Sequence, residues 1–579
     1  MNQPALLQQK HSASQAWLRA LEMTARLDDA PERIFPLVIE ELGKRFGAAP
    51  ALLGTRENLS HAELAARANQ YARWALSNGI EKGDCLCLLM PNRPDYLALW
   101  LGLTRIGAVV ALINTNLTGE SLAHCITVAA PKHILVDSRL DIALEGLETP
   151  AIIWRHGEGF AQKLAEFSGD ALAGDEIREI TLADPALLIY TSGTTGLPKA
   201  AHVSHHRVMM WTHWFAGMMG ATEDDRLYNC LPMYHSVGGV VASGAVLLAG
   251  GAVILREKFS ASAFWDDIAD SGATIFQYIG ELCRYLLKTE PRPHGLRLIC
   301  GNGLSADIWE HLQARFHIPQ VLEFYAATEG NFSLYNAEGK VGAIGRIPGF
   351  LRHRFAISLV GRGPDGEVLR GPDGFCRPVA TGEAGEAIAK IAGGAARFEG
   401  YSDAAATAKK ILRNVFAPGD AWVRSGDLMR RDAQGFYYFV DRLGDTFRWK
   451  GENVATTEIA AALLAYPGIT AATVYGVAIG GHDGKAGMAA IETGEGFQLS
   501  GLKPWLAAKL PSYARPLFLR LAADLAVTET FKQKKQELAA EGFDPETIGD
   551  PLYADIGEAQ YASLDGRLYA RINSGLIRF

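Results

Sequence analysis

The chain has 579 residues, of which 48% are apolar and 21% charged, and its formal net charge is −8. This length exceeds one ordinary hydrophobic core, so we expect about two to four domains, and the composition excludes a disordered chain. A net negative charge without a long run of basic residues argues against a nucleic-acid partner. The cysteines are odd in number and scattered, which fits a reducing compartment and no zinc site.

Two segments bear on membranes and secretion. Residues 1–20 lack a positively charged stretch followed by an apolar block, so we expect no signal peptide and a cytoplasmic location. Residues 236–255 are uncharged and long enough for a transmembrane helix. Gly250 and Gly251 divide this segment into a helical part and a short β-branched part. We therefore predict a buried helix, turn and strand.

Helical and strand patterns alternate in the first part of the chain. They are a helix begun by the capping box of Ser60 and Glu63, a strand at 85–90, a helix at 94–106 and a strand at 108–113. The unbroken apolar run at 85–90 is typical of a strand covered on both faces. This order predicts a mostly parallel sheet with helices on its faces.

Later segments suggest further organisation. The order of strand, helix and strand recurs faintly at 228–255, as two similar α/β halves would explain. Residues 340–400 are rich in Gly and Pro and carry short β-type runs, which predict hairpins. After about residue 445 the pattern becomes α+β. We place the boundary between domains 1–442 and 443–579.

One loop has the composition of a phosphate site. Residues 190–199, YTSGTTGLPK, place hydroxyls, glycines and a lysine directly after an apolar strand. Glycines allow close backbone approach, while amides, hydroxyls and an ammonium donate to phosphate. The spacing is not that of Walker A, and a flexible polar turn is the alternative. The candidate ligands are Thr191, Ser192, Gly193, Thr194, Thr195, Gly196 and Lys199.

This loop resembles the signature of the adenylate-forming (AMP-binding) enzymes. Segments that resemble the other motifs of that family follow in the correct order: YAATEGN at 325–331, RSGDL at 424–428, DRLGDTFRWKGENV at 441–454 and the lysine of VTETFKQKK, Lys532. DTFRWKGENV, the context of Lys532 and the tail at 550–579 resemble one subfamily, the very-long-chain acyl-CoA synthetases, also called fatty acid transport proteins. The resemblance covers nearly the whole chain.

The resemblance implies an α/β fold with a large N-terminal domain of two α/β subdomains plus a small β-barrel, followed by a small mobile α+β domain. It also implies that a fatty acid attacks the α-phosphate of ATP and that coenzyme A then attacks the acyl adenylate. Such chemistry needs a divalent metal, neutralised phosphates and a cation at the point of attack. We expect an ATP- and Mg²⁺-dependent ligase for long-chain or very-long-chain fatty acids.

The resemblance also implies the catalytic roles. Thr328 would add a hydroxyl near the α-phosphate, and Glu329 would hold Mg²⁺, since a hard cation prefers a carboxylate. Lys532 would bridge the attacking carboxylate and ATP, although its neighbours Lys534 and Lys535 leave the assignment open. His235 would flank the acyl pocket, and an ordinary buried or surface histidine is the alternative.

Further residues would hold the nucleotide and coenzyme A. Asp427 would accept hydrogen bonds from both ribose hydroxyls, and Arg442 would reach the same region. Gly451 would let pantetheine pass close to the backbone, where a Cβ would intrude. The residues that would line the adenine are Gly301, Asn302, Gly303 and the stacking ring of Tyr325.

The sequence departs from the wider family at the hinge and leaves other functions open. Gly444, followed by Asp445, stands where many members carry Asp or Lys, so the hinge residue is undetermined. The alternatives are a CoA ligase for another acid (bile-acid, carnitine-type or aromatic) and an uptake protein that traps fatty acid as its CoA ester. A peripheral contact with the inner face of a membrane and a homodimer are compatible with both.

Overall fold

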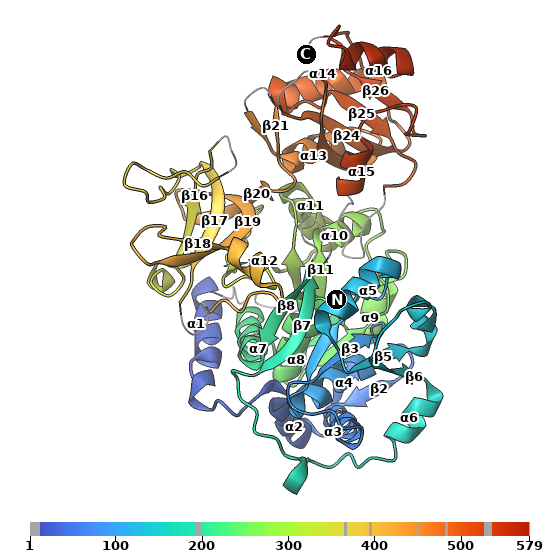
Figure 1. The fold of residues 1–579 in the computed structure, drawn as a ribbon, viewed down its shortest axis with the longest axis vertical. Helices are drawn as coiled ribbons and strands as arrows, with labels where there is room; N and C mark the ends of the chain where they lie inside the picture. Colours follow the sequence, from blue (N-terminus) through green and yellow to red (C-terminus); the bar gives the residue numbers. More distant parts are fainter. Residues whose placement is uncertain are drawn as a thin grey trace, which may run out of the picture. The chain divides into compact units, whose positions relative to one another are not determined.

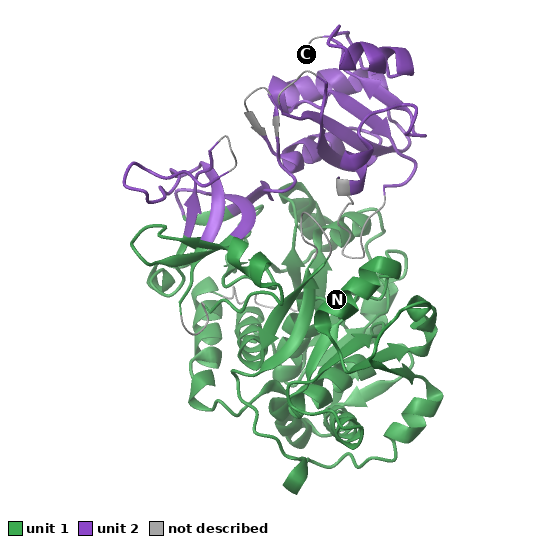
Figure 2. Cartoon of the chain, in the orientation of Figure 1, with its two compact units in different colours: residues 1–357, 389–424, 435–437 green, residues 358–388, 425–434, 438–579 purple. Residues whose placement is uncertain are grey.

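The computed structural model describes residues 12–191, 198–363, 367–392, 397–449, 452–480, 484–525 and 535–577. The chain divides into two compact units, coloured separately in Figure 2. Unit 1 comprises residues 1–357, 389–424 and 435–437, and unit 2 comprises 358–388, 425–434 and 438–579. The domain boundary at residue 442 stays a prediction.

A six-stranded sheet in unit 1 carries the first strands that the sequence predicts (Figure 1). Its order is β6-β5-β3-β4-β7-β8, and every neighbouring pair is parallel except the antiparallel pair of β7 and β8. The strands are β3 (Cys85–Leu89), β4 (Val109–Leu112), β5 (His133–Asp137), β6 (Ile152–His156), β7 (Pro185–Thr191) and β8 (Lys199–Ser204). The predicted strands and their parallel pairing are confirmed.

The helices around this sheet follow the sequence signals. Ser60 and Glu63 form the expected capping box at the start of α3 (His61–Ser77). Helix α4 (Pro94–Arg105) is almost entirely buried and packs closely against α3. The shorter helices of this part are α5 (Gly119–Ala129) and α6 (Glu158–Leu164).

A second sheet of unit 1 has the order β15-β14-β13-β12-β11-β9-β10-β1-β2. From β13 to β1 the neighbours are parallel, and β13-β14, β14-β15 and β1-β2 are antiparallel. The strands are β1 (Pro50–Leu53), β2 (Asn58–Ser60), β9 (Arg226–Asn229), β10 (Ala252–Leu255), β11 (Ile275–Ile279), β12 (Leu298–Asn302), β13 (Val321–Ala326), β14 (Ser333–Asn336) and β15 (Gly345–Arg346).

The uncharged segment at 236–255 lies inside this second part of unit 1. It forms a π-helical turn (Val237–Val241), helix α8 (Ala242–Leu248) and strand β10, which confirms the predicted helix, turn and strand. Because β9 and β10 are parallel, as are β3 and β4, both predicted halves contain a strand–helix–strand unit. Within the described ranges, every helix is too short or too polar to cross a membrane.

The remaining helices of unit 1 complete its packing. Helix α7 (His205–Met219) contacts both α8 and α1 (Ala13–Thr24). Helix α12 (Ala404–Lys409) precedes the short strand β18 (Ile411–Arg413). The others are α2 (Phe35–Phe46), α9 (Phe264–Ser271), α10 (Gly280–Leu286) and α11 (Ala306–Phe316).

The expected small β-barrel does not close among the described residues. Strands β16 (Ile357–Val360), β17 (Ala384–Lys390), β19 (Ala421–Arg431) and β20 (Phe436–Arg442) follow one another as an open path. The Gly- and Pro-rich stretch between β16 and β17 contributes only isolated bridges, such as Val360–Pro378, to the described pairing. Proline cannot donate to a ladder and glycine weakens one, which explains why the described part of this stretch forms no closing ladder.

The C-terminal part of unit 2 is the predicted α+β module. Its sheet has the order β23-β24-β25-β26-β27, in which only β24 and β25 are parallel. The strands are β23 (Ile469–Val477), β24 (Ala486–Thr493), β25 (Phe518–Leu521), β26 (Leu552–Ala554) and β27 (Ala562–Ser563), preceded by the hairpin of β21 (Phe447–Trp449) and β22 (Glu452–Val454). The helices are α13 (Thr456–Leu464), α14 (Leu499–Lys509), α15 (Lys535–Glu541) and α16 (Gly566–Asn573).

The packing of α4 on α3 gives a stability prediction. A Cβ at Gly102 would lie 2.3 Å from the carbonyl oxygen of Ala68, so Gly102→Ala must push the two helices apart. We expect a loss of about 1–3 kcal/mol in unfolding free energy, because overpacking strains a close-packed core. Thermal and urea unfolding measure this loss.

Gly159 is the matched control for this prediction, because it also lies in a helix but a Cβ added there would meet no neighbouring atom within 4 Å. Gly159→Ala should leave stability unchanged or raise it by up to about 1 kcal/mol, through helix propensity. Equal effects of the two substitutions would contradict the packing argument.

Candidate functional site

The hairpin of β7 and β8 holds both ends of the predicted phosphate loop. Thr191, the last residue of β7, is paired with Lys199, the first residue of β8. Five of the predicted ligands, Ser192, Gly193, Thr194, Thr195 and Gly196, lie outside the described residues. The described part therefore brings the first and last predicted ligands together.

Tyr401 contacts both ends of this loop. Its segment pairs with β8 through the bonds Ser402 N–H to Ala200 O (3.0 Å) and His202 N–H to Gly400 O (3.1 Å). The Lys199 ammonium lies 5.9 Å from the centre of the Tyr401 ring, and the Tyr401 hydroxyl is hydrogen-bonded to Thr191. Burial and the carboxylate of Glu329 raise the pKa of Tyr401, so its hydroxyl keeps its proton.

Thr328 and Glu329 lie in the loop between β13 and β14, within the same unit. The Glu329 carboxylate forms an ion pair with Lys410 (Oε1 to Nζ, 3.2 Å) and accepts a hydrogen bond from Tyr401. Burial acts to raise the pKa of Glu329, but Lys410 and these hydrogen bonds outweigh it and hold the pKa below its usual value. The Thr328 hydroxyl is 3.0 Å from the hydroxyl of Ser236.

The donor set around Glu329 fits a magnesium ion that is shared with a substrate. Among the described residues, no three His, Cys, Asp or Glu side chains gather as a metal cluster. Mg²⁺ is commonly held by one or two carboxylates together with substrate phosphates and water. The Glu329 carboxylate, which Tyr401 links to both ends of the predicted phosphate loop, would satisfy this requirement.

Arg207 holds the backbone of the Thr328–Gly330 loop from α7. Its guanidinium donates to the carbonyl oxygens of Thr328 (2.7 Å), Gly330 (3.1 Å) and Arg397 (3.4 Å). Its Nε lies 3.9 Å from the Glu399 carboxylate. Glu399 in turn accepts from the backbone N–H and the hydroxyl of Ser204, the N-cap of α7. These bonds fix the loop against the start of α7.

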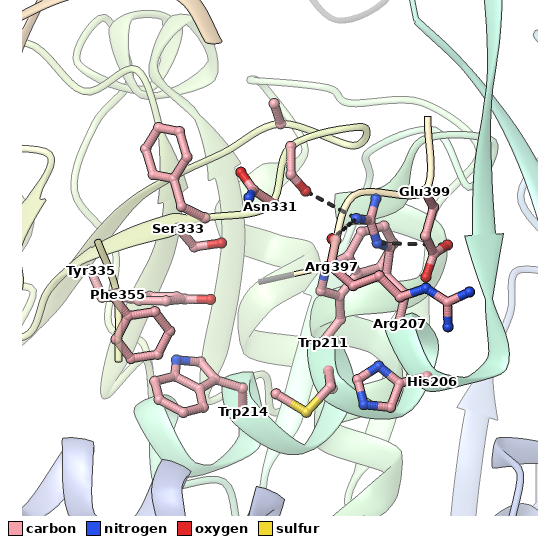
Figure 3. A pocket seen from close by; sticks show the side chains of 14 residues that line it. His206, Arg207, Trp211, Trp214, Asn331, Ser333, Tyr335, Phe355, Arg397 and Glu399 are labelled. Atoms are coloured by element: carbon pink, nitrogen blue, oxygen red, sulfur yellow. Dashed lines mark hydrogen bonds and ion pairs between the residues drawn. The ribbon is translucent and has the colours of Figure 1, made fainter. Parts of the chain in front are cut away.

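A pocket opens beside this network (Figure 3). The rings of Trp214, Tyr335 and Phe355 form an aromatic side, whereas Arg207 and Glu399 lie on a polar side. The other lining residues are His206, Met210, Trp211, Ala327, Gly330, Asn331, Phe332, Ser333 and Arg397. Because Ala327 and Gly330 flank Thr328 and Glu329, the pocket adjoins the predicted metal carboxylate.

His235 lies on the segment that leads into the π-helical turn. Its ring packs on that of Tyr234 at 4.5 Å, and it immediately precedes Ser236, the partner of Thr328. His235 is not a lining residue of the pocket in Figure 3. Its role beside an acyl chain stays a prediction.

A buried carboxylate supports the segment predicted to line adenine. Glu323 accepts from the backbone N–H groups of Gly303 (2.6 Å) and Leu304 (3.2 Å) and from the Tyr278 hydroxyl. Burial raises its pKa to about 8. A Cβ at Gly301 would lie 2.1 Å from the carbonyl oxygen of Tyr278, so packing of β12 on β11 alone requires this glycine.

The other residues predicted for adenine lie at strand ends. Asn302 ends β12, and Gly303 follows it with a positive φ of 82°. Tyr325 is half-buried near the end of β13, with its ring 5.5 Å from that of Phe332. Parallel strands β12 and β13 therefore present all three residues at one edge of the sheet.

In unit 2, the structure brings together the two residues predicted for the ribose. Arg442 Nε lies 3.6 Å from the carboxylate of Asp427, which is 7% exposed. The strands that carry them are tied by the bond from Leu443 N–H to Gly426 O (2.9 Å). Two polar groups from the consecutive strands β19 and β20 thus share one location.

Lys535 is anchored at the predicted hinge. Its ammonium lies 3.4 Å from the Asp445 carboxylate and donates to the Thr456 hydroxyl (2.6 Å). Lys532, Lys534 and Gly451 lie outside the described residues. Lys535, which is the one of these three neighbouring lysines that the structure describes, therefore binds the predicted hinge segment within unit 2.

Sequence reasoning missed the side chains that support the site: Arg207, Glu323, Glu399, Tyr401 and Lys410. Lys410 follows Lys409 at the end of an Ala-rich helix, a pattern that is typical of two solvent-exposed lysines. One signal was present for Arg207, since a cation in the first turn of a helix opposes the macrodipole and needs acidic or carbonyl partners.

Comparisons with known proteins identify relatives of the chain. The family model described as AMP-binding enzyme matches residues 39–359. Long-chain fatty acid transport protein 1 of Mus musculus is 40% identical over 93% of this chain and 87% of its own length. Long-chain fatty acid transport protein 2 of Rattus norvegicus is 38% identical over 98% of this chain and 95% of its own.

Solved structures share the fold. ATP-bound MatB from Rhodopseudomonas palustris superposes with a TM-score of 0.74 at 24% identity, covering 87% of this chain and 98% of its own. The o-succinylbenzoate CoA synthetase MenE from Bacillus subtilis, in complex with its acyl-adenylate intermediate, gives a TM-score of 0.72 at 22% identity, covering 88% and 98%. These likenesses confirm the α/β fold class.

The Arg207 network gives a second stability prediction. Arg207→Met would leave Glu399 and three carbonyl groups without their buried partner, so we expect a loss of about 3–5 kcal/mol in unfolding free energy. Arg207→Lys should recover part of it, because an ammonium keeps the charge without the planar fork. Calorimetry and urea unfolding measure the unfolding free energy of both variants.

Arg33 is the matched control, because its side chain is 39% exposed and pairs with the exposed Glu41. Arg33→Met should change stability by less than about 1 kcal/mol. If Arg207→Met costs no more than Arg33→Met, the buried network does not hold the loop.

Proposed function

Because the chain belongs to the AMP-binding enzyme family, in the subfamily of the fatty acid transport proteins or very-long-chain acyl-CoA synthetases, we propose that it is an ATP-dependent fatty acid–CoA ligase. The fatty acid carboxylate attacks the α-phosphate of ATP and pyrophosphate leaves. The coenzyme A thiol then attacks the acyl adenylate and AMP leaves. The observation that carries this proposal is the Glu329 carboxylate, which is paired with Lys410, lies next to an aromatic pocket and is linked through Tyr401 to both ends of the predicted phosphate loop.

Several described residues of unit 1 would each have a role in the first step, the formation of the acyl adenylate. Lys199 and Thr191, at the ends of the loop, would bind the outgoing phosphates, and the Thr328 hydroxyl would donate near the point of attack. Glu329 would hold Mg²⁺, which when bound neutralises charge on the triphosphate. Arg207 would act as a positioning residue, because it holds the carbonyl groups of Thr328 and Gly330 and so orients the loop.

The pocket in Figure 3 supports a fatty acid as substrate. Its aromatic side, which includes Trp214 and Phe355, would bury methylene groups, each worth about 0.8 kcal/mol. Its other end adjoins Thr328, where the carboxylate must react. An apolar wall that leads to a polar reaction point suits the methylene groups close to the carboxylate of an acid.

Several assignments rest on the family resemblance. Lys532 would stabilise the charge that develops as the carboxylate attacks, and the domain of residues 443–579 would rotate between the two steps. Asp427 and Arg442 would bind the ribose, which their proximity in unit 2 supports. Gly451 would give pantetheine close access to the backbone.

Pyrophosphate exchange into ATP tests the proposed reaction. We expect exchange that requires Mg²⁺ and a fatty acid, and AMP release once coenzyme A is added. A panel of straight-chain acids from butyrate to lignocerate gives the chain-length preference, and bile acids, carnitine precursors and benzoate test the alternative acids. Exchange with one of these acids and none with any fatty acid would overturn the proposed substrate class.

Substitution of Lys532 separates the two steps. Lys532→Ala should lower fatty-acid-dependent exchange by at least about 100-fold, because a cation at the reacting charge is lost. It should still form the thioester from supplied acyl adenylate. Lys535→Ala is the comparison: it removes the hinge contacts with Asp445 and Thr456, so both steps should slow together. Normal exchange by Lys532→Ala would show that another residue supplies the charge.

We further propose a peripheral contact with the inner face of a membrane through residues 349–355. Phe350 is 50% exposed, and the exposed residues Arg352, His353 and Arg354 follow it. Phe355, at the end of the segment, lines the pocket. An exposed ring among cations suits an interface of acyl chains and anionic headgroups. This contact would serve uptake by trapping, in which fatty acid from the bilayer is converted to its CoA ester.

Co-sedimentation with vesicles tests this contact. The wild type should bind phosphatidylglycerol vesicles more than phosphatidylcholine vesicles, and the triple variant Phe350→Ser, Arg352→Glu, Arg354→Glu should bind several-fold less, because both attractions are removed. Ile142→Ser, which alters an isoleucine that is 74% exposed elsewhere, is the control. Equal binding by the triple variant and the control would refute the assignment of this segment.

A further inference from the structure

Hydrogen bonds of its backbone N–H and carbonyl groups fix the position of Lys410. Its N–H donates to the carbonyl of Thr407 (3.1 Å), and its carbonyl accepts from the N–H of Arg424 (2.8 Å). The hydroxyl of Thr407 also accepts from the N–H of Tyr401 (2.9 Å). One short helix, α12, therefore fixes both the lysine and the tyrosine that contact Glu329.

The side chain of Lys410 forms an ion pair with a largely buried carboxylate. The Glu329 side chain is 13% exposed and that of Lys410 is 24% exposed, with 3.2 Å between Oε1 and Nζ. Burial of a charged group without a partner is costly, which favours a cation at this position beside Glu329. A second cation that the structure describes near Glu329, Arg207, already donates to three carbonyl groups.

The metal needs the same carboxylate. A lysine ammonium is a compact charge on a flexible stem of four carbons, so it can withdraw while its backbone stays fixed. A divalent ion at Glu329 would repel the ammonium at close range, because like charges interact strongly away from bulk water. The two cations are therefore alternatives at this carboxylate.

We propose that Lys410 is a built-in counter-ion that holds and orients the Glu329 carboxylate before the metal arrives, and that the metal displaces it. Lys410 is thus a positioning residue, which acts on the metal through Glu329. This inference rests on the proposed role of Glu329 as the metal ligand. It implies that the ion pair competes with the metal and weakens its binding.

Manganese binding tests the competition directly. Mn²⁺, followed by electron paramagnetic resonance, is titrated into protein saturated with a non-hydrolysable ATP analogue at mildly alkaline pH. We expect Lys410→Met to bind Mn²⁺ about 5-fold more tightly than the wild type, as removal of a competing ion pair of ordinary strength would give. Lys410→Arg should stay close to the wild type, because it keeps the counter-charge.

Lys409→Met is the matched control, because Lys409 is exposed and precedes Lys410 in the chain. It should bind Mn²⁺ as the wild type does. Thermal unfolding gives a second readout: Lys410→Met should have a lower midpoint without ligands and a larger rise on addition of Mn²⁺ and the analogue. A purely structural ion pair would lower the midpoint and leave Mn²⁺ affinity unchanged.

The outcomes separate this inference from the proposed function. If Lys410→Met binds Mn²⁺ as Lys409→Met does, or more weakly, the counter-ion proposal is overturned. If Lys410→Met does not fold, Lys410→Gln takes its place in the same titration. Glu329→Gln tests the premise: if it binds Mn²⁺ as tightly as the wild type, Glu329 is no metal ligand and its proposed role fails.

Discussion

The need to keep a carboxylate ionised in a largely buried loop governs the arrangement of the site. Glu329 lies where water is scarce, and an uncompensated charge there would be costly. Lys410 supplies the charge, Tyr401 supplies a hydrogen bond, and Arg207 fixes the backbone on either side. The supporting groups come from α7 and from the segment around α12, which explains why both must pack against the loop.

The same arrangement links the ends of the predicted phosphate loop to Glu329, the predicted metal ligand. Tyr401 contacts Thr191 and Lys199 at the ends of the loop and donates to Glu329. A displacement of the 400–402 segment would therefore move the phosphate and metal contacts together. Such coupling suits a reaction in which the metal and the phosphates must arrive and depart as one unit.

The sequence predicted the elements whose signals are local. The capping box at Ser60, the apolar runs of β3 and β4 and the glycine pair at 250–251 each produced the expected structure. The expected barrel does not close among the residues that the structure describes, and closure depends on the pairing of distant strands. Lys410 and Arg207 were missed for a related reason: whether a charged side chain is solvated or buried beside a partner far along the chain is decided by tertiary packing, which residue type does not reveal.

The bonds of Arg207 also bear on how the protein is made. They join residues separated by 121, 123 and 190 positions, and Ser204 is joined to Glu399 across 195. Contacts of such sequence separation form slowly, because the intervening chain must be ordered first. During synthesis from the N-terminus, Arg207 of α7 lacks its partner Glu399 until residue 399 has left the ribosome. The nascent chain is therefore exposed to misfolding and chaperone capture over that interval.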